Sequence, residues 1–327
     1  MKNKINISEF LQNLLASYKD SRTKKNIEEF FGKIFTNKSI QLWKISKNSK
    51  EYQRFHNLIK GELVNTLDVK TLNKNLLINS ISCLKGQYRV VVIHDGSEIR
   101  KPESKELENI GFVQSLDGTW IKGYKTLNSI LIDNQTEKIK LLNCTPYSNA
   151  DPKFISQSEK KKFETGKLTD LERKAEIEKI LSESEDYNSK TITKEQIQKI
   201  HDEIKETNPE IIIIHVLDRG FDSVEIFEFI EQLGDKYVIR FKNNRNSNEK
   251  TLNENNKEVF LKLANKEFTN KQEVIYSKVG FQKKVYHNAK GIFEWDTVVI
   301  ENKVYQVLKV RFYTHDGKKY LKIQCCL

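Results

Sequence analysis

Two apolar runs in this sequence each end in a histidine followed by an aspartate, and aspartate could do chemistry there. The run "VVVIHDGSEI" (residues 90–99) carries His94 and Asp95, and "IIIIHVLDRG" (residues 211–220) carries His215 and Asp218. A buried strand should not end on an ionised carboxylate that has no partner, because an unpaired buried charge is costly. The pattern therefore predicts that the two acids share a task.

Two such strands lying side by side would bring Asp95 and Asp218 together. Mutual repulsion would then raise one pKa, unless a divalent cation lay between the carboxylates. Hard oxygen ligands without a supporting thiolate favour Mg²⁺ or Mn²⁺ over zinc. Such an ion can activate a water or hydroxyl group and stabilise the charge that develops in phosphodiester cleavage. We therefore expect Asp95 and Asp218 to be catalytic, metal-binding residues.

Simpler roles for the same residues stay open. Asp95 and Gly96 could form a turn, and Asp218 could pair with Arg219 or cap the helix that follows. Asp222, which precedes "SVEIFEFI", is the better helix N-cap, and this leaves Asp218 free for other work. The histidines precede their aspartates at different spacings, so we interpret them as core residues rather than as ligands.

The two acids require particular elements to position them. Residues 88–94 and 211–217 are apolar and β-branched, which predicts strands buried on both faces, and we expect them to be parallel neighbours. Residues 118–147 alternate and predict two further strands with a hairpin tip at Asp133 to Gln135. The segment "KYVIRFKNNRN" predicts another strand, which ends in basic residues.

Helical and β-rich segments flank these strands. The apolar spacing in residues 1–85 predicts helices, and basic residues interleaved with Trp43, Tyr52 and Phe55 raise the hypothesis of a DNA-end-binding domain. The alternative is that these basic and aromatic residues only form a solvent-exposed helix surface with no DNA-binding role. Residues 155–208 are charged and helix-prone, which predicts a solvated helical insertion. Residues 251–327 predict a mostly antiparallel sheet.

Length and composition limit the classes of protein. The chain has 327 residues, which predicts two or three units, and its 56 Lys plus Arg against 45 Asp plus Glu give a net charge of +11. A basic balance favours a polyanionic partner such as DNA, although the abundance of Lys, Asn and Ile is also what an AT-rich genome imposes. No membrane-length apolar run, signal peptide or zinc-type cysteine spacing is present, so we expect a cytoplasmic protein with no membrane partner.

The order of these segments resembles the DDE transposases of bacterial insertion sequences, in the group with a late β insertion. The resemblance rests on "HDGSEIRKP", "GTWIKGYKTLNSILID", "IIIIHVLDRGFDS" and "YVIRFKNN", in that order. It implies an α/β fold: a ribonuclease-H-like mixed-sheet core over residues 86–244, interrupted by the helical insertion, an N-terminal helical domain over 1–85 and a β-rich insertion over 245–327.

The resemblance also implies a function and its residues. Asp95 and Asp218 match the family's first two metal-binding acids, which would hold Mg²⁺ or Mn²⁺. Arg240, Lys242 and Arg245 look like strand-end and loop residues that meet DNA phosphates. The implied activity is metal-dependent DNA cleavage and strand transfer at transposon ends. The implied partners are double-stranded DNA, as transposon end and as target, and a second copy of the chain in a homodimer.

The sequence departs from the family at the third acid, which should lie on a helix within a pattern of Tyr, two residues, Arg, three residues and Glu. Tyr237 and Arg240 have the first spacing, but Asn244 stands where Glu should be. Glu294 and Glu301 lie in sheet or turn sequence. Because the chain stops at "LKIQCCL" as an apolar strand finishes, we expect a C-terminally truncated transposase.

Three functions remain open at this point. The first is an active DDE enzyme. The second is a non-catalytic DNA-binding remnant that inhibits an intact copy through dimerisation, and the third is a metal-dependent nuclease of the same fold.

Overall fold

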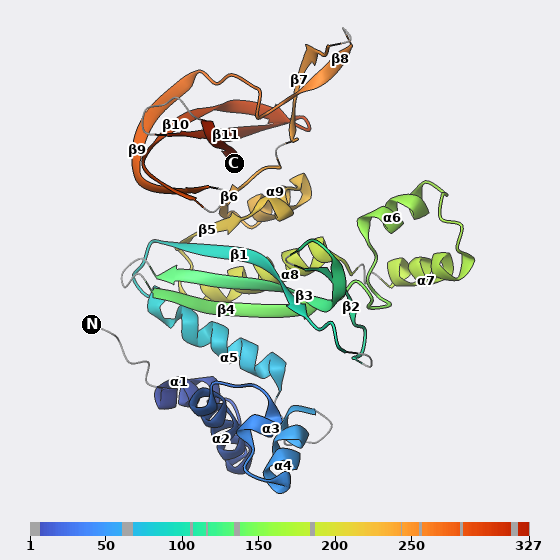
Figure 1. Cartoon of the computed structure of the whole chain (residues 1–327), viewed down its shortest axis with the longest axis vertical. Coiled ribbons are helices and arrows are strands. Elements are labelled where there is room, and N and C mark those ends of the chain that lie inside the picture. The colour runs from blue at the N-terminus through green and yellow to red at the C-terminus, as the bar shows by residue number, and fades with distance from the viewer. Residues whose placement is uncertain are drawn as a thin grey trace.

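The computed structural model describes residues 7–60, 68–104, 107–115, 117–133, 138–183, 187–242, 244–254, 257–281, 284–314 and 320–326. Helices open the chain, a mixed sheet with helices follows, and further sheets close it (Figure 1). No helix within these ranges is long and apolar enough to cross a membrane.

The N-terminal helices form a small core of their own, as their apolar spacing predicts. They are α1 (Ile7–Leu14), α2 (Ser21–Asn37), α3 (Leu42–Ile45) and α4 (Ser49–Lys60). Asp20 begins α2 by accepting the backbone N–H groups of Arg22 and Thr23. The side chains buried between these helices are Leu15, Ile27, Phe30, Ile45, Phe55 and Leu58.

The central sheet is mixed. Its strands are β1 (Arg89–Arg100), β2 (Gly111–Gln114), β3 (Trp120–Asp133), β4 (Lys138–Tyr147), β5 (Ile212–Leu217) and β6 (Lys236–Ile239). Strands β1, β5 and β6 are mutually parallel, and β3 pairs antiparallel with β1, β2 and β4. The prediction that the two Asp-bearing strands are parallel neighbours is confirmed, because Arg89 to His94 pair with Ile212 to Leu217.

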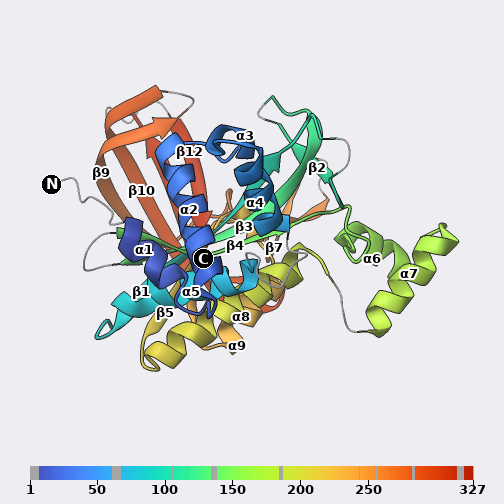
Figure 2. The ribbon, with the colours of Figure 1, turned by 90° about the horizontal axis from the view of Figure 1, so that it is seen from below.

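One face of this sheet is covered by two helices, α5 (Val69–Ile81) and α8 (Ser189–Thr207), which lie close together in Figure 2. The side chains of Val90, Val92 and Ile213 point to this face and are fully buried. The opposite face carries half-buried or exposed aliphatic side chains, which are Val91, Ile93, Ile130, Ile132, Ile139, Leu141, Ile212, Ile214, Val216 and Val238. The expectation of strands buried on both faces is therefore correct for one face only.

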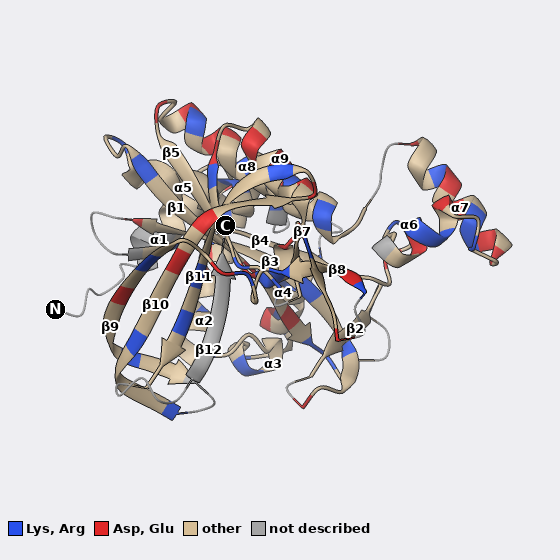
Figure 3. Cartoon of the chain, turned by 90° about the horizontal axis from the view of Figure 1, so that it is seen from above, with Lys and Arg blue, Asp and Glu red and all other residues tan. Residues whose placement is uncertain are grey.

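The expected helical insertion at 155–208 divides into two parts. Helices α6 (Gln157–Glu164) and α7 (Leu171–Ser182) extend away from the sheet, and Figure 3 shows charges of both signs along them. Helix α8 instead packs on the sheet through buried residues that include Ile197, Ile200 and Ile204. The interpretation of the whole segment as solvated is wrong for α8, because its apolar stripe supplies core contacts.

The last part of the chain is antiparallel, as predicted. Strands β7 (Asn246–Leu252) and β8 (Glu258–Lys262) form a hairpin, and β9 (Asn270–Phe281), β10 (Lys284–Ile300), β11 (Lys303–Tyr313) and β12 (Tyr320–Cys326) form a four-stranded sheet. Helix α9 (Val224–Gln232) joins this sheet to the central one. Its Phe227 packs in one core with Ile239 of β6 and Val307 of β11.

Candidate active site

Strands β1 and β5 bring Asp95 and Asp218 to the same level of the sheet. His94 and Leu217 are register partners, so each aspartate lies one residue beyond a paired position. Because side chains alternate along a strand, Asp95 lies on the same face as Val91 and Ile93. Its register partner on β3 is Asn128. Because β1 continues to Arg100, the alternative in which Asp95 and Gly96 form a turn is wrong.

The two carboxylates interact electrostatically, and no described residue forms an ion pair with either of them. Burial raises the pKa of Asp95, and the charge of Asp218 raises it further. Neither acid forms an ion pair with any residue that the structure describes, so Asp218 is not paired with Arg219. Asp218 accepts the N–H of Gly220 at 2.7 Å and caps the short 3₁₀ helix η2 (Arg219–Phe221). Repulsion between uncompensated acids is the condition that favours a bound cation.

The donor set fits one hard divalent cation. Asp95 and Asp218 supply carboxylate oxygens, the ligands that Mg²⁺ and Mn²⁺ prefer, and the neighbouring His94 side chain points to the other face of the sheet. Within the described ranges, no cluster of three or more His, Cys, Asp or Glu side chains could hold a metal ion. The described residues therefore offer two protein ligands.

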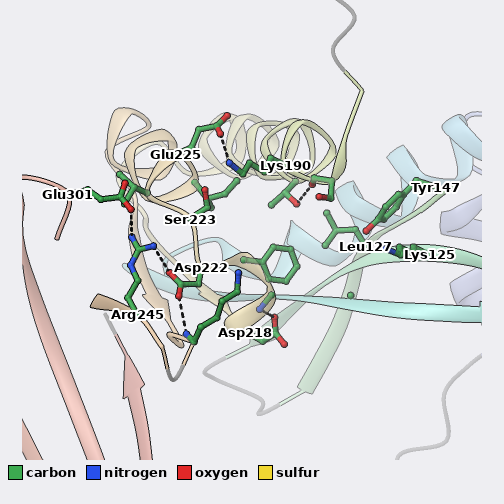
Figure 4. Close-up of a pocket in the computed structure, with 18 residues that line it drawn as sticks. Lys125, Leu127, Tyr147, Lys190, Asp218, Asp222, Ser223, Glu225, Arg245 and Glu301 are labelled. Carbon is green, nitrogen blue, oxygen red and sulfur yellow. Dashed lines mark hydrogen bonds and ion pairs between the residues drawn. The ribbon is translucent and has the colours of Figure 1, made fainter. Parts of the chain in front are cut away.

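A cavity of about 680 Å³ lies beside Asp218. Its walls come from β1, β3, the start of α8, η2, the start of α9 and the turn between β10 and β11 (Figure 4). Asp218 lines the cavity, whereas Asp95 does not. Four cationic residues also line it, which are Lys125, Lys190, Lys242 and Arg245.

These four cationic side chains differ in whether a carboxylate already neutralises their charge. Lys190 lies 2.8 Å from Glu225; burial raises the pKa of that carboxyl group, but hydrogen bonds from Lys190 and Lys194 lower it to about 2. The side chains of Lys125 and Lys242 form no ion pair with a described residue. They are therefore the two cavity cations whose charge is available to an anionic ligand.

Asp222 anchors one wall of the cavity instead of capping a helix. Its Oδ2 atom accepts the backbone N–H of Lys242 at 2.9 Å, and its Oδ1 atom lies 3.6 Å from Nη1 of Arg245. Helix α9 begins after Ser223, which makes no side-chain cap. The prediction that Asp222 caps this helix is wrong, because its carboxylate is turned inward, where only 1% of the side chain is exposed.

The three residues expected to meet DNA occupy different environments. Lys242 is exposed and lines the cavity. Arg245 lines it too, but its side chain is only 16% exposed and also lies 3.3 Å from Glu301. Arg240 is half-buried, donates its backbone N–H to the carbonyl of Leu217 at 3.1 Å, and does not line the cavity.

Sequence reasoning missed Lys125 and Lys190 because they lie on β3 and α8, far from both acids along the chain. Lys125 becomes a candidate only once the pairing of the strands is known. The antiparallel pairing of β3 with β1 puts Lys125 opposite Glu98, three residues after Asp95.

The two candidates for a third acid lie apart from Asp95. Glu294 is buried in the β9–β12 sheet, with Arg311 Nη2 at 2.5 Å and Lys309 Nζ at 3.6 Å. Glu301 occupies the turn between β10 and β11, lines the same cavity as Asp218 and pairs with Arg245. Both carboxylates are therefore already matched with cations.

Comparisons with known proteins give only weak likenesses. The chain matches no protein-family model and no curated protein. Among solved structures, a chain described as "Crystal structure of a pre-cleavage Mos1 transpososome" aligns at 10% sequence identity with a TM-score of 0.19. The alignment covers 67% of this chain and 60% of the length of that chain.

Proposed function

We propose that this protein is a DNA-processing enzyme of the insertion-sequence transposase type, acting by metal-dependent cleavage and strand transfer at transposon ends. The observation that carries the proposal is the placement of Asp95 and Asp218 at one level of two parallel strands, with no ion pair to either acid from a residue that the structure describes. The strand order β4-β3-β1-β5-β6, in which β3 alone runs antiparallel to the other four strands, is the order that a ribonuclease-H-like core would require.

Each acid has a definite task in this proposal. Asp95 and Asp218 would hold Mg²⁺ or Mn²⁺ between them. The bound ion would lower the pKa of a water or 3′-hydroxyl group and stabilise negative charge at phosphorus. Asn128 of β3 is the register partner of Asp95, and the hydrogen bond from the N–H of Gly220 to Asp218 caps the turn directly after β5.

DNA would approach along the basic side of the cavity. Lys125 and Lys242 are the cavity cations without an ion pair among the described residues, so they would meet phosphates next to Asp218. The net charge of +11 supports the same partner. On the N-terminal helices, Trp43 is 68% exposed with the ammonium group of Lys44 over its ring, which supports a further DNA contact there.

A second function, DNA binding without catalysis, is favoured by a different observation. The described residues supply two carboxylates at the acid pair and no third. A site of this kind could hold DNA and one ion and still cleave poorly, and such a chain would compete with an active copy for the same DNA ends.

The proposal is tested by Mn²⁺ binding to the full chain, followed by electron paramagnetic resonance. We expect one Mn²⁺ per chain in the wild type and loss of that ion in Asp95→Asn and in Asp218→Asn. Asp117→Asn, which removes a carboxylate from an exposed loop, is the matched control and should bind normally. Unchanged Mn²⁺ affinity in both acid variants would overturn the metal site.

A labelled duplex separates the two functions. Slow strand cleavage that needs Mn²⁺ and vanishes in Asp95→Asn supports the enzyme. Tight DNA binding with no cleavage in any metal supports the non-catalytic function.

A further inference from the structure

A line of buried hydrogen bonds crosses the covered face of the central sheet, immediately behind the acid pair. The Oγ atom of Ser129 lies 2.7 Å from Nδ1 of His94, and Nε2 of His94 lies 2.9 Å from Nδ1 of His215. Nε2 of His215 lies 3.1 Å from Oδ2 of Asp235. The two histidines are 1% and 0% exposed, so water cannot substitute for these partners.

The line continues at both ends into α8. Asp235 Oδ2 is also 2.7 Å from Nδ1 of His201, and Ser129 Oγ accepts from Gln196 Nε2 at 2.5 Å. Gln196 Oε1 in turn accepts from the hydroxyl of Thr145 on β4 at 2.7 Å. The network therefore connects β1, β3, β4, β5, α8 and the segment before β6.

Hydrogen-bonding capacity fixes the direction of every bond in this line. An ionised Asp235 only accepts, so His215 donates from Nε2 and, when neutral, accepts at Nδ1. His94 must then donate from Nε2 and accept the hydroxyl proton of Ser129 at Nδ1.

Hydrogen bonds running in the opposite direction along the line would leave a donor without an acceptor. A protonated His215 would donate from both nitrogens, and His94 would then have to donate to Ser129. The Ser129 oxygen already accepts from Gln196, so its own proton would have no acceptor among the described side chains. The one-way order from Thr145 through Gln196, Ser129 and the histidines to Asp235 gives the Ser129 hydroxyl group and all four ring nitrogens a partner of the right kind.

We infer that His94 and His215 are positioning residues, both held as Nε2–H tautomers, and that their hydrogen bond sets the spacing of Asp95 and Asp218. The inference deepens the proposed function and rests on it for the role of the two acids. His94 directly precedes Asp95, and Ser129 directly follows Asn128, the register partner of Asp95. Aliphatic packing alone tolerates small shifts between strands, whereas directional hydrogen bonds hold one arrangement.

The first measurement reads the tautomers without any metal. Nitrogen-15 NMR of the full chain labelled at histidine should show Nε2 protonated and Nδ1 unprotonated for both His94 and His215. Ser129→Ala removes the donor to His94 Nδ1 and should alter the His94 signals. Protonation of Nδ1 on either ring, in the wild type, would contradict the directional order.

The second measurement asks whether the network positions the acids. In His94→Leu/His215→Leu both partners of the central hydrogen bond become apolar, while Ser129 keeps Gln196 and Asp235 keeps His201, so we expect the chain to fold. We expect circular dichroism like the wild type but Mn²⁺ affinity at least about 10-fold weaker, the usual scale for losing support behind a metal ligand. His287→Leu, at an exposed position of β10, is the matched control.

A folded double variant with wild-type Mn²⁺ affinity would overturn the positioning role. If the double variant does not fold, Ser129→Ala takes its place, and unchanged Mn²⁺ affinity together with altered His94 signals would overturn the role equally. A wild type that shows the expected tautomers but binds no Mn²⁺ overturns the proposed function while leaving the directional order intact, so the two failures are distinguishable.

Discussion

Asp95, within β1, and Asp218, directly after β5, lie at the same level of two adjacent parallel strands, because the residues before them, His94 and Leu217, are register partners. The charge of Asp218 reaches Asp95 and helps to raise its pKa. An isolated protein gains nothing from holding two uncompensated acids together, since their repulsion destabilises the folded state. The arrangement therefore supports the proposed cation site at these two residues.

Replacing one acid should lower the pKa of the other. In Asp218→Asn, the pKa of Asp95 should fall because the like charge is gone, yet stay above its ordinary value because burial, the larger cause, remains. Carbon-13 NMR titration of the Asp95 carboxyl group measures this. Asp117→Asn should leave the Asp95 titration unchanged, and an unchanged pKa in Asp218→Asn would show that the carboxylates do not interact.

The same shift sets a pH dependence of stability without metal. A group whose pKa is raised on folding binds more protons in the folded state, so it favours folding at low pH and this contribution is lost as pH rises. The free energy of unfolding should therefore decline from the ordinary pKa of an aspartate up to the raised pKa of Asp95. Urea unfolding across that window should show a smaller decline in Asp218→Asn.

Removing Arg245 should affect stability more than DNA binding. Its guanidinium group faces Asp222, whose side chain is only 1% exposed, and lies 6.0 Å from the rings of Phe227 and Phe241. Arg245→Ala leaves that carboxylate buried without its cation, so we expect a loss of about 3 kcal/mol in the free energy of unfolding. The control is Lys250→Ala, which breaks an exposed pair with Glu258 and should cost under about 1 kcal/mol. Equal losses in both variants would contradict this.

Lys242 and Lys125 should carry the salt dependence of DNA binding at the cavity. Each phosphate contact changes the slope of log affinity against log salt by about −0.9, because counterions are released. Lys242→Ala, and likewise Lys125→Ala, should make that slope shallower by about 0.9 in a fluorescence anisotropy titration. Arg240→Ala should change it less, since Arg240 is half-buried away from the cavity. An unchanged slope in both lysine variants would place the DNA elsewhere.

The elements that carry the acids could be predicted because their signal is local. Residues 90–93 and 211–214 are aliphatic throughout, and such runs favour buried strands whatever surrounds them. Their parallel pairing followed from the two matching ends. Which face of these strands is left uncovered could not be predicted, because neighbouring residues such as Val91 and Val92 are of the same type. Only the position of α5 and α8 makes Val92 buried and leaves Val91 half-buried.

The rest of the site depends on contacts between distant segments. Helix α8 carries charged residues between Ile197, Ile200 and Ile204, and the charges concealed its core role. Asp222 precedes a helix as an N-cap does, but its partner Arg245 lies 23 residues later and takes the carboxylate inward. His94 and His215 were correctly interpreted as core residues, yet the partners that order them come from β3 and α8 and from Asp235.

The last prediction concerns rate, and it follows from the number of acids. Two carboxylates can anchor one ion, whereas two-ion phosphoryl transfer also neutralises the oxygen on the other side of phosphorus. Losing one such electrostatic contribution costs about 100- to 1000-fold, so against a typical turnover near 10 per second we expect a single-turnover cleavage rate of about 0.01 to 0.1 per second. End-labelled transposon-end duplexes with Mn²⁺ measure this rate.

Three variants test which acids take part. Asp95→Asn should abolish the product. Glu294→Gln and Glu301→Gln should leave the rate within about twofold, because Arg311 and Arg245 already hold those carboxylates. Fast cleavage that is lost in Glu301→Gln would show instead that the turn between β10 and β11 supplies the third ligand from across the cavity.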